Sequence, residues 1–357
     1  MTKKTVLVLG AGSSVEFGLP AGNKLASEIR QRLHPHTSAQ PERLIADRTV
    51  WASIHADDFA QLQNGRISGP EYDRRFDALK QALETICRGL GLSRSIDDFL
   101  YNHGTNQSVV DIGKMAIVSA ILDAERYSSI YALETLSATD RLDKHRDTWL
   151  YKLFTHLQTG VRRESANEIF STLQIINFNY DRCVEHFLAC AVEDAYSLTR
   201  TEAERIVSNL DIVHPYGQVG WLPWQGRKEH TAPFGATISA EELSGLSAQI
   251  KTFTEQNHSD SERAQLRAMI REARVVVFLG FGFHKQNMAL ISPGRPVNSS
   301  GPACFATCYG TSASDQAVFK TLINEGLRDP AYSAPVLTEL TCDQFIDEYG
   351  LLLWGQR

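Results

Sequence analysis

The sequence predicts an α/β protein in which a doubly wound, parallel β-sheet carries an inserted helical subdomain. Short apolar runs, each followed by a glycine or a polar residue, are typical of strands that are buried on both faces of a parallel sheet. Helical stretches separate these runs in the second half of the chain, as in repeated β-α units. The runs are Val6–Leu9, Leu173–Ile176, Ile212–Val213, Val275–Leu279 and Cys304–Tyr309.

The first strand ends at Gly10, and a helical pattern starts at about Pro20. From about residue 35 to 167 we find amphipathic helices but no convincing strand. One helix has its apolar residues at Phe76, Leu79, Leu83, Ile86 and Leu90, and a later one has them at Trp149, Leu150, Leu153, Phe154 and Leu157. We therefore predict a sheet core of residues 1–34 and 168–357 and a helical insertion of residues 35–167.

Polar residues and glycines follow the strands of the second half. The second strand leads into Asn177–Asp181, where Asp181 suits the next helix as its N-cap. The third strand ends at His214 and the fourth ends at Gly280. Since open α/β sheets bind ligands at the carboxyl ends of their strands, these residues are candidates for one common site.

The composition argues against several classes of protein. The 357 residues are 43% hydrophobic, which suffices for a core, and the six scattered cysteines form no C-x-x-C pair or zinc-site spacing. We therefore expect reduced thiols, no metal site and a cytoplasmic protein. The polar start and the short apolar run Val6–Leu9 argue against a signal peptide and a membrane span. The formal charge of -6 offers no excess of positive charge for binding phosphate backbones, so nucleic acid is not directly expected as a partner.

The glycine-rich segment after the first strand is a candidate phosphate site. It consists of Gly10, Ala11, Gly12, Ser13 and Ser14, and it precedes a predicted helix. Glycines there let the backbone approach a pyrophosphate, whose charge is met by amide N–H groups and the helix dipole. However, Val15 stands where the plain dinucleotide fingerprint has a small residue, and a tight turn is an alternative reason for the glycines.

Four motifs in this chain resemble those of sirtuins and occur in the same order. The segment Gly10–Pro20, GAGSSVEFGLP, resembles the sirtuin signature G-A-G-x-S-x-x-x-G-x-P along its whole length. Downstream, Asn179–Asp181 is similar to the sirtuin N-x-D, and His214 is similar to the catalytic histidine. Gly280–Gly282 resembles the later glycine turn that meets the phosphates and the ribose. The resemblance implies a Rossmann-like core that binds NAD.

The chain also departs from the deacylase branch of that family. Ala21–Asn23 replaces the Asp-Phe-Arg that sirtuin deacylases carry, and the four-cysteine zinc module is absent. The chain instead resembles the sirtuin-like NADases of bacterial antiphage defence, in which phrases such as Phe278–His284 and His-x-Tyr-Gly recur. This resemblance implies hydrolysis of NAD to nicotinamide and ADP-ribose, without a metal.

The resemblance also implies roles for individual residues. Cleavage of the N-glycosidic bond passes through an oxocarbenium-like ribose, and the cationic nicotinamide leaves without a strong acid. Asn179 would position the ribose or water, with His214 as the second catalytic residue, while Asp181 would accept the nicotinamide amide. The residues expected to contact NAD are Gly10, Ala11, Gly12, Ser13, Ser14, Asp181, Tyr216, Gly280, Phe281 and Gly282.

Two residues compete for the place of the catalytic histidine. Sirtuins have His directly before Gly, whereas Pro215 and Tyr216 intervene here before Gly217. In an extended segment, residues 214 and 216 project to the same side. We favour His214, because a neutral imidazole can accept a proton near pH 7 and a phenol of pKa near 10 is a poor base there.

Two other functions compete with NAD hydrolysis. One is an NAD-dependent protein deacylase, and the other is a catalytically silent module that binds NAD or ADP-ribose and signals through its assembly. An unrestrained NADase would kill its host by removing cellular NAD, so the activity of such an enzyme must be restrained. The resemblance implies that restraint comes from a homo-oligomer or from a co-encoded regulatory protein, such as a ring ATPase or another sensor.

Overall fold

Six parallel strands form the sheet of the computed structural model, which describes residues 4–35, 44–136, 141–252, 260–296, 300–329 and 334–355. The strand order is β3-β2-β1-β4-β5-β6, as in Rossmann-like dinucleotide-binding folds. The predicted α/β fold with a doubly wound parallel sheet is confirmed. The strands are β1 (Thr5–Leu9), β2 (Leu173–Asn177), β3 (Asp211–Val213), β4 (Val275–Leu279), β5 (Ala303–Thr307) and β6 (Val336–Thr338).

The last strand, β6, is the one that the sequence does not predict. It is only three residues long and pairs in parallel with β5 at the edge of the sheet. Its first residue, Val336, is exposed. A run this short, and exposed at its start, lacks the pattern of a buried strand.

The carboxyl ends of β1 and β4 form the switch point of the sheet. Leu9 at the end of β1 pairs with Asn177 on one side and with Leu279 on the other. All residues of β1 and β4 are buried. Connections on the two sides of this point run over opposite faces of the sheet, and ligands of doubly wound folds bind in the crevice that results.

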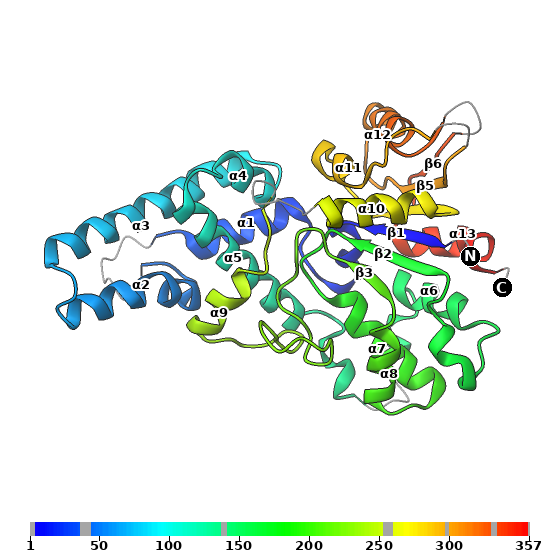
Figure 1. Ribbon diagram of the computed structural model, residues 1–357, viewed down its shortest axis with the longest axis horizontal. Coiled ribbons are helices and arrows are strands. Elements are labelled where there is room, and N and C mark those ends of the chain that lie inside the picture. Colours follow the sequence, from blue (N-terminus) through cyan, green and yellow to red (C-terminus); the bar gives the residue numbers. More distant parts are fainter. Residues whose placement is uncertain are drawn as a thin grey trace. The chain divides into compact units, whose positions relative to one another are not determined.

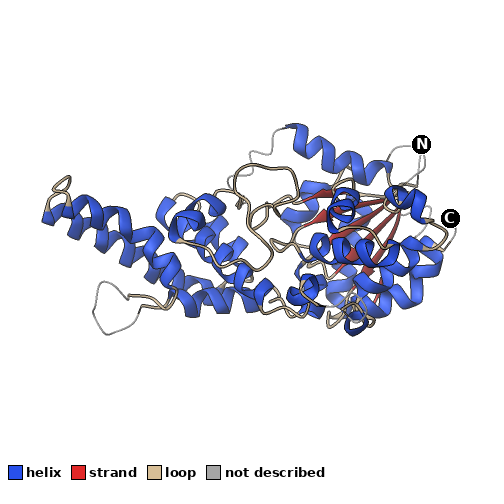
Figure 2. Cartoon of the chain, turned by 90° about the horizontal axis from the view of Figure 1, so that it is seen from below, coloured by secondary structure: helices blue, strands red, loops and turns tan. Residues whose placement is uncertain are grey.

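Helices cover both faces of the sheet (Figures 1 and 2). Figure 1 shows one layer built from α10 (Asp260–Glu272), α11 (Lys285–Ile291) and α12 (Ala313–Gly326). The opposite layer contains α6 (Trp149–Gln158), α7 (Cys183–Tyr196), α8 (Arg200–Val207) and α13 (Cys342–Trp354). Short 3-10 helices connect the elements, among them η1 (Ala11–Phe17), η4 (Tyr131–Glu134), η5 (Asp143–His145) and η6 (Arg163–Glu168).

The chain divides into two compact units. The sheet unit contains Met1–Phe17, Ser129–Pro215 and Asn257–Arg357, and the helical unit contains Gly18–Ser128 and Tyr216–Gln256. The helical unit is built from α1 (Gly22–Leu33), α2 (Arg48–Gln63), α3 (Gly69–Gly89), η3 (Leu90–Leu92), α4 (Ile96–Asn102), α5 (Gln107–Arg126) and α9 (Ala240–Ser247).

These units differ from the predicted boundaries at both ends of the helical insertion. Residues 129–167 join the sheet unit, because the apolar face of α6 packs against α13 and α7. Residues 18–34 join the helical unit, where α1 packs against α5 and α3. Residues 216–256 also join it through α9, which packs on α5 and α2. Periodicity locates the helices, but it does not indicate which surface each apolar face covers.

None of the described helices has the length and the apolar character that crossing a membrane requires.

Candidate active site at the carboxyl edge of the sheet

Two glycine turns meet at the switch point of the sheet unit. The backbone N–H of Gly10 donates to the carbonyl of Leu279 (3.1 Å), and that of Gly12 donates to the carbonyl of Gly280 (3.0 Å). A Cβ atom on Gly10 would lie 2.6 Å from the Gly280 oxygen. Gly280 has φ +57, and its Cβ would lie 2.2 Å from the nitrogen of Ser13. Both turns therefore need glycine because their backbones touch.

This contact changes the interpretation of the first glycine segment. The N–H of Gly12 is already engaged with Gly280, and the N–H of Ser13 donates to the Gly10 carbonyl (2.9 Å). Two of the amides expected to meet a pyrophosphate thus donate within the protein. The alternative reason for the glycines, tight backbone packing, accounts for Gly10 and Gly12 without any ligand.

The other residues of these turns have different surroundings. Ala11 is half-buried at the start of η1. The Phe281 ring is buried among Phe178, Phe278 and Phe283, with centroids 5.2 to 5.5 Å apart. Its side chain therefore belongs to the aromatic core. A Cβ on Gly282 would lie 3.1 Å from the ring of His284.

A buried network joins Asn179 to the two serines of the first glycine segment. Nδ2 of Asn179 donates to Oγ of Ser13 (3.2 Å) and to Oγ of Ser14 (3.0 Å). The Ser14 hydroxyl donates to Oδ2 of Asp181 (2.9 Å). The other carboxylate oxygen of Asp181 accepts from the N–H of Cys183 (3.1 Å). The segments that follow β1 and β2, which are distant in sequence, thus form one continuous set of hydrogen bonds.

Asp181 contacts the start of α7, while its expected contact with the nicotinamide amide stays a prediction. The helix α7 begins at Cys183, and Arg182 holds the N-cap position, so the predicted N-cap lies one residue too early. The Asp181 carboxylate nevertheless bonds to the first amide of α7, because an Asp side chain reaches two residues forward.

Among the described residues, three buried polar atoms of this site find no hydrogen-bond partner: Oδ1 of Asn179, Nδ2 of Asn177 and Oε2 of Glu185. Asn179 is 7% exposed, and its amide is oriented by the two serine hydroxyls. A buried polar atom without a partner is costly and is unusual in native structures. A bound molecule or water that donates to Oδ1 of Asn179 would remove this cost.

The His214 ring is fixed through both of its nitrogens. Nδ1 lies 3.0 Å from the backbone carbonyl of Asn179, and Nε2 lies 2.9 Å from Oε1 of Glu185. Burial lowers the pKa of His214, but the charge and hydrogen bond of Glu185 and the Asn179 carbonyl raise it more, so the pKa lies above its ordinary value. Because both nitrogens face acceptors, the ring is stabilised as a cation. In this arrangement both ring nitrogens are engaged within the protein, and the role as a base that the sequence suggests stays a prediction.

Tyr216, the alternative to His214, belongs to the helical unit. Its side chain is buried, and its carbonyl accepts from the N–H of Lys251 (3.0 Å).

Several residues of the site were not predicted from the sequence. Glu185 and Asn177 complete the surroundings of His214 and Asn179, and Oγ1 of Thr307 accepts from the N–H of Gly280 (2.9 Å). Asn177 and Thr307 are the last residues of β2 and β5, so their place at a strand end was the available signal. Glu185 lies in the first turn of α7 and carried no such signal.

Glu16 and Trp149 connect the first glycine segment to neighbouring helices. Nε1 of Trp149 donates to the carbonyl of Ser13 (2.7 Å). The Glu16 carboxylate accepts from the N–H groups of Trp149 (2.8 Å) and Asp343 (3.0 Å), which open α6 and α13. Burial raises the pKa of Glu16 to about 7, although both backbone bonds act in the opposite direction. One carboxylate thus connects η1 to two helix N-termini.

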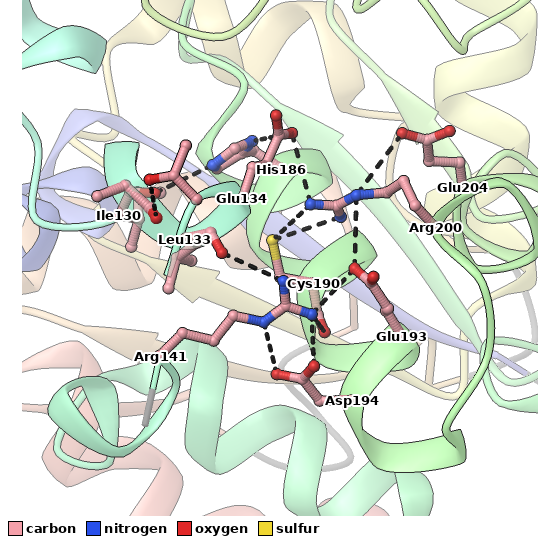
Figure 3. Close-up of polar contacts among 12 residues, drawn as sticks. Ile130, Leu133, Glu134, Arg141, His186, Cys190, Glu193, Asp194, Arg200 and Glu204 are labelled. Carbon is pink, nitrogen blue, oxygen red and sulfur yellow. Dashed lines mark hydrogen bonds and ion pairs between the residues drawn. The ribbon is translucent and has the colours of Figure 1, made fainter. Parts of the chain in front are cut away.

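A second polar cluster, the arginine network, connects Arg141 and Glu134 to α7 and α8 of the sheet unit (Figure 3). Arg141 donates to Asp194 through Nε (2.7 Å) and Nη2, and to Glu193 through Nη2 (2.9 Å). Arg200 contacts the sulfur of Cys190 through Nη1 and Nη2 (3.4 and 3.3 Å). Burial raises the pKa of the Cys190 thiol, so it stays protonated. The two arginines form ion pairs with the four carboxylates of Glu134, Glu193, Asp194 and Glu204, and the network is a structural clamp.

Among the described residues, no group of three or more His, Cys, Asp and Glu side chains is arranged to hold a metal ion.

No protein-family model matches this chain, and no curated protein matches its sequence.

Proposed function

We propose that the chain hydrolyses NAD to nicotinamide and ADP-ribose at the switch point of its sheet unit. The observation that carries the proposal is the Asn179 amide, which two serine hydroxyls orient while its buried Oδ1 has no partner. The likeness of the four motifs to those of sirtuins supports the choice of NAD, and the likeness of Phe278–His284 to sirtuin-like NADases supports hydrolysis. The Rossmann-like strand order supports a dinucleotide at this edge.

In the proposed reaction the bond between C1′ of the ribose and the nicotinamide nitrogen breaks, and its electron pair neutralises the pyridinium. Water adds to C1′ on the opposite face and releases one proton. Oδ1 of Asn179 would accept a hydrogen bond from the attacking water or from a ribose hydroxyl. No strong acid is needed, because the leaving group is already cationic.

His214 and Glu185 would act through Asn179 as positioning residues. Nδ1 of the ring would hold the Asn179 carbonyl, and Glu185 would hold the ring at Nε2. A positively charged imidazole would be a poor base, but it would donate well to a backbone carbonyl. In this proposal bulk solvent accepts the proton that the attacking water releases.

A catalytically silent module that binds NAD or ADP-ribose is the second candidate. The observation in its favour is that neither nitrogen of His214 is free to accept a proton. The two functions differ in whether nicotinamide is released.

The test is to incubate the purified full chain with NAD and to quantify nicotinamide by chromatography. Asn179→Ala should lower the rate at least about 10²-fold, since orientation of the reacting groups is lost. Asn209→Ala, at an exposed residue of the same unit, is the matched control and should release nicotinamide like the wild type. NAD binding by calorimetry without nicotinamide release would favour the silent module.

We further propose that the activity is cytoplasmic and restrained by self-association or by a co-encoded sensor such as a ring ATPase. The assay is therefore run with the chain alone and with the co-encoded protein added. Release of acetyl groups from a peptide substrate in place of nicotinamide hydrolysis would favour the deacylase.

A further inference from the structure

A pocket of about 310 Å³ opens within the helical unit. It is bounded by the end of α1, the first turn of α2, the end of α5 and the segment before α9. All of its lining residues belong to this one unit. Its charged lining consists of Arg32, Arg48, Arg126, Asp47 and Asp123.

Arg32 is held in place by two aspartates. Its Nη1 donates to Asp123 (2.7 Å) and lies 3.4 Å from Asp47. Asp47 also accepts from the N–H of Val50 (3.0 Å) and from the Ser119 hydroxyl (2.5 Å). Within the described part of the chain, Nε and Nη2 of Arg32 have no acceptor, although its side chain is 27% exposed. The guanidinium is thus oriented and keeps donors for another molecule.

Arg126, another lining residue, is fixed in a similar way and shares Asp123 with Arg32. Nε and Nη2 donate to the carbonyls of Gly235 (2.9 Å) and Ala236 (2.7 Å), and Nη1 donates to Asp123 (3.0 Å). The loop before α9 is thereby attached to the end of α5. These bonds hold the Arg126 side chain in place without a ligand, which lowers the entropic cost of binding.

The charge of the pocket is positive. Three arginines against two aspartates leave one positive charge, and both carboxylates already accept guanidinium bonds. Arg48 carries the uncompensated charge, because no residue of the described ranges pairs with it. It stands with Thr49 in the first turn of α2, where the helix dipole also favours an anion.

We propose that this pocket binds the phosphate group of a small phosphate monoester. Guanidinium groups and a threonine hydroxyl are the donors that recognise phosphate. Leu122 and Ile238 give the organic part an apolar wall. At about 310 Å³ the pocket lies at the low end of the range for ligand sites, and it suits a sugar phosphate or a mononucleotide. The inference does not depend on the proposed NAD hydrolysis.

The experiment measures Kd by calorimetry for inorganic phosphate, ribose 5-phosphate and AMP with the full chain. Arg48→Gln should weaken binding by about tenfold or more, because one charge-assisted contact is lost. Arg48 is exposed and has no partner in the described ranges, so the variant should fold. Thr237→Trp, at an exposed lining residue, should block the pocket and serves as a second variant.

Two controls separate this site from others. Arg88→Gln removes an 85% exposed arginine of α3 and should leave Kd unchanged. Asn179→Ala should also leave it unchanged, which distinguishes this pocket from the candidate active site. Tighter binding of AMP than of inorganic phosphate would identify a nucleotide, and equal binding would identify the phosphate alone. The proposal is overturned if none of the three binds, or if both pocket variants bind like the wild type.

Discussion

Replacement of Glu185 by Gln tests whether the His214 ring is a fixed cation. Nε2 of His214 and Oε1 of Glu185 are 2.9 Å apart, and their side chains are 7% and 2% exposed. Removing one partner of a buried ion pair costs about 3–5 kcal/mol when the other stays charged. Without the Glu185 charge, burial dominates and should move the pKa of His214 below its ordinary value.

The sign of the pH dependence follows from these directions. In the wild type the His214 pKa is raised, so its stabilisation is fully present below the unfolded pKa of about 6.5 and is lost as pH rises through the folded pKa. In the variant the folded pKa is lowered, so stability should instead rise as pH approaches neutrality. The wild type should exceed Glu185→Gln in unfolding free energy by about 3–5 kcal/mol near pH 5.5 and by clearly less near pH 8.5.

The assay is urea unfolding of the full chain at several pH values, with the His214 ring followed by NMR. Glu164→Gln, at an exposed position of the sheet unit, is the matched control and should reproduce the wild-type curve. Parallel pH profiles for wild type and Glu185→Gln would refute the argument, because His214 would then titrate independently of Glu185.

Three further predictions concern the arginine network, Glu16 and the second glycine turn. Arg141→Gln should lower the free energy of unfolding by about 3–5 kcal/mol in urea, because Asp194 keeps its charge without its cation; a loss below 1 kcal/mol would contradict the clamp. Because the pKa of Glu16 is raised to about 7, the wild type should lose stability as pH rises from about 5 to 8, and Glu16→Gln should flatten this fall. Allowing for solvent screening, the effect should be about 1–2 kcal/mol in the free energy of unfolding. An unchanged slope would argue against the raised pKa of Glu16. Gly280→Ala should cost at least about 2 kcal/mol in thermal unfolding, against about 1 kcal/mol for Gly160→Ala, which has φ +76 and open space; equal costs would exclude the backbone contact.

The sequence predicts the sheet well because its central strands are short and buried on both faces. Val6–Leu9 and Val275–Leu279 are apolar throughout, so their pattern admits few alternatives. The strand ends then locate the candidate site, because parallel strands place their carboxyl ends at one edge. Asn179, Asp181 and the two glycine turns meet there.

Partners across the fold could not be predicted in the same way. Glu185 reaches His214 from a helix, and Glu16 reaches two helix N-termini that are more than a hundred residues away. Neither contact follows a local period or motif. The unit boundaries differ for the same reason, since amphipathic helices such as α6 can cover either a sheet or other helices.

The residues that carry the likeness to sirtuin-like enzymes also hold this sheet unit together. Gly10, Gly12 and Gly280 are needed for the contact between two turns, and Asp181 bonds to the start of α7. These residues would be retained for folding alone. Oδ1 of Asn179 is different, because it is buried and the fold gives it no partner. The proposed function assigns this oriented acceptor to a molecule that donates to it, so the loss of nicotinamide release in Asn179→Ala, with folding intact, is the most discriminating result for function.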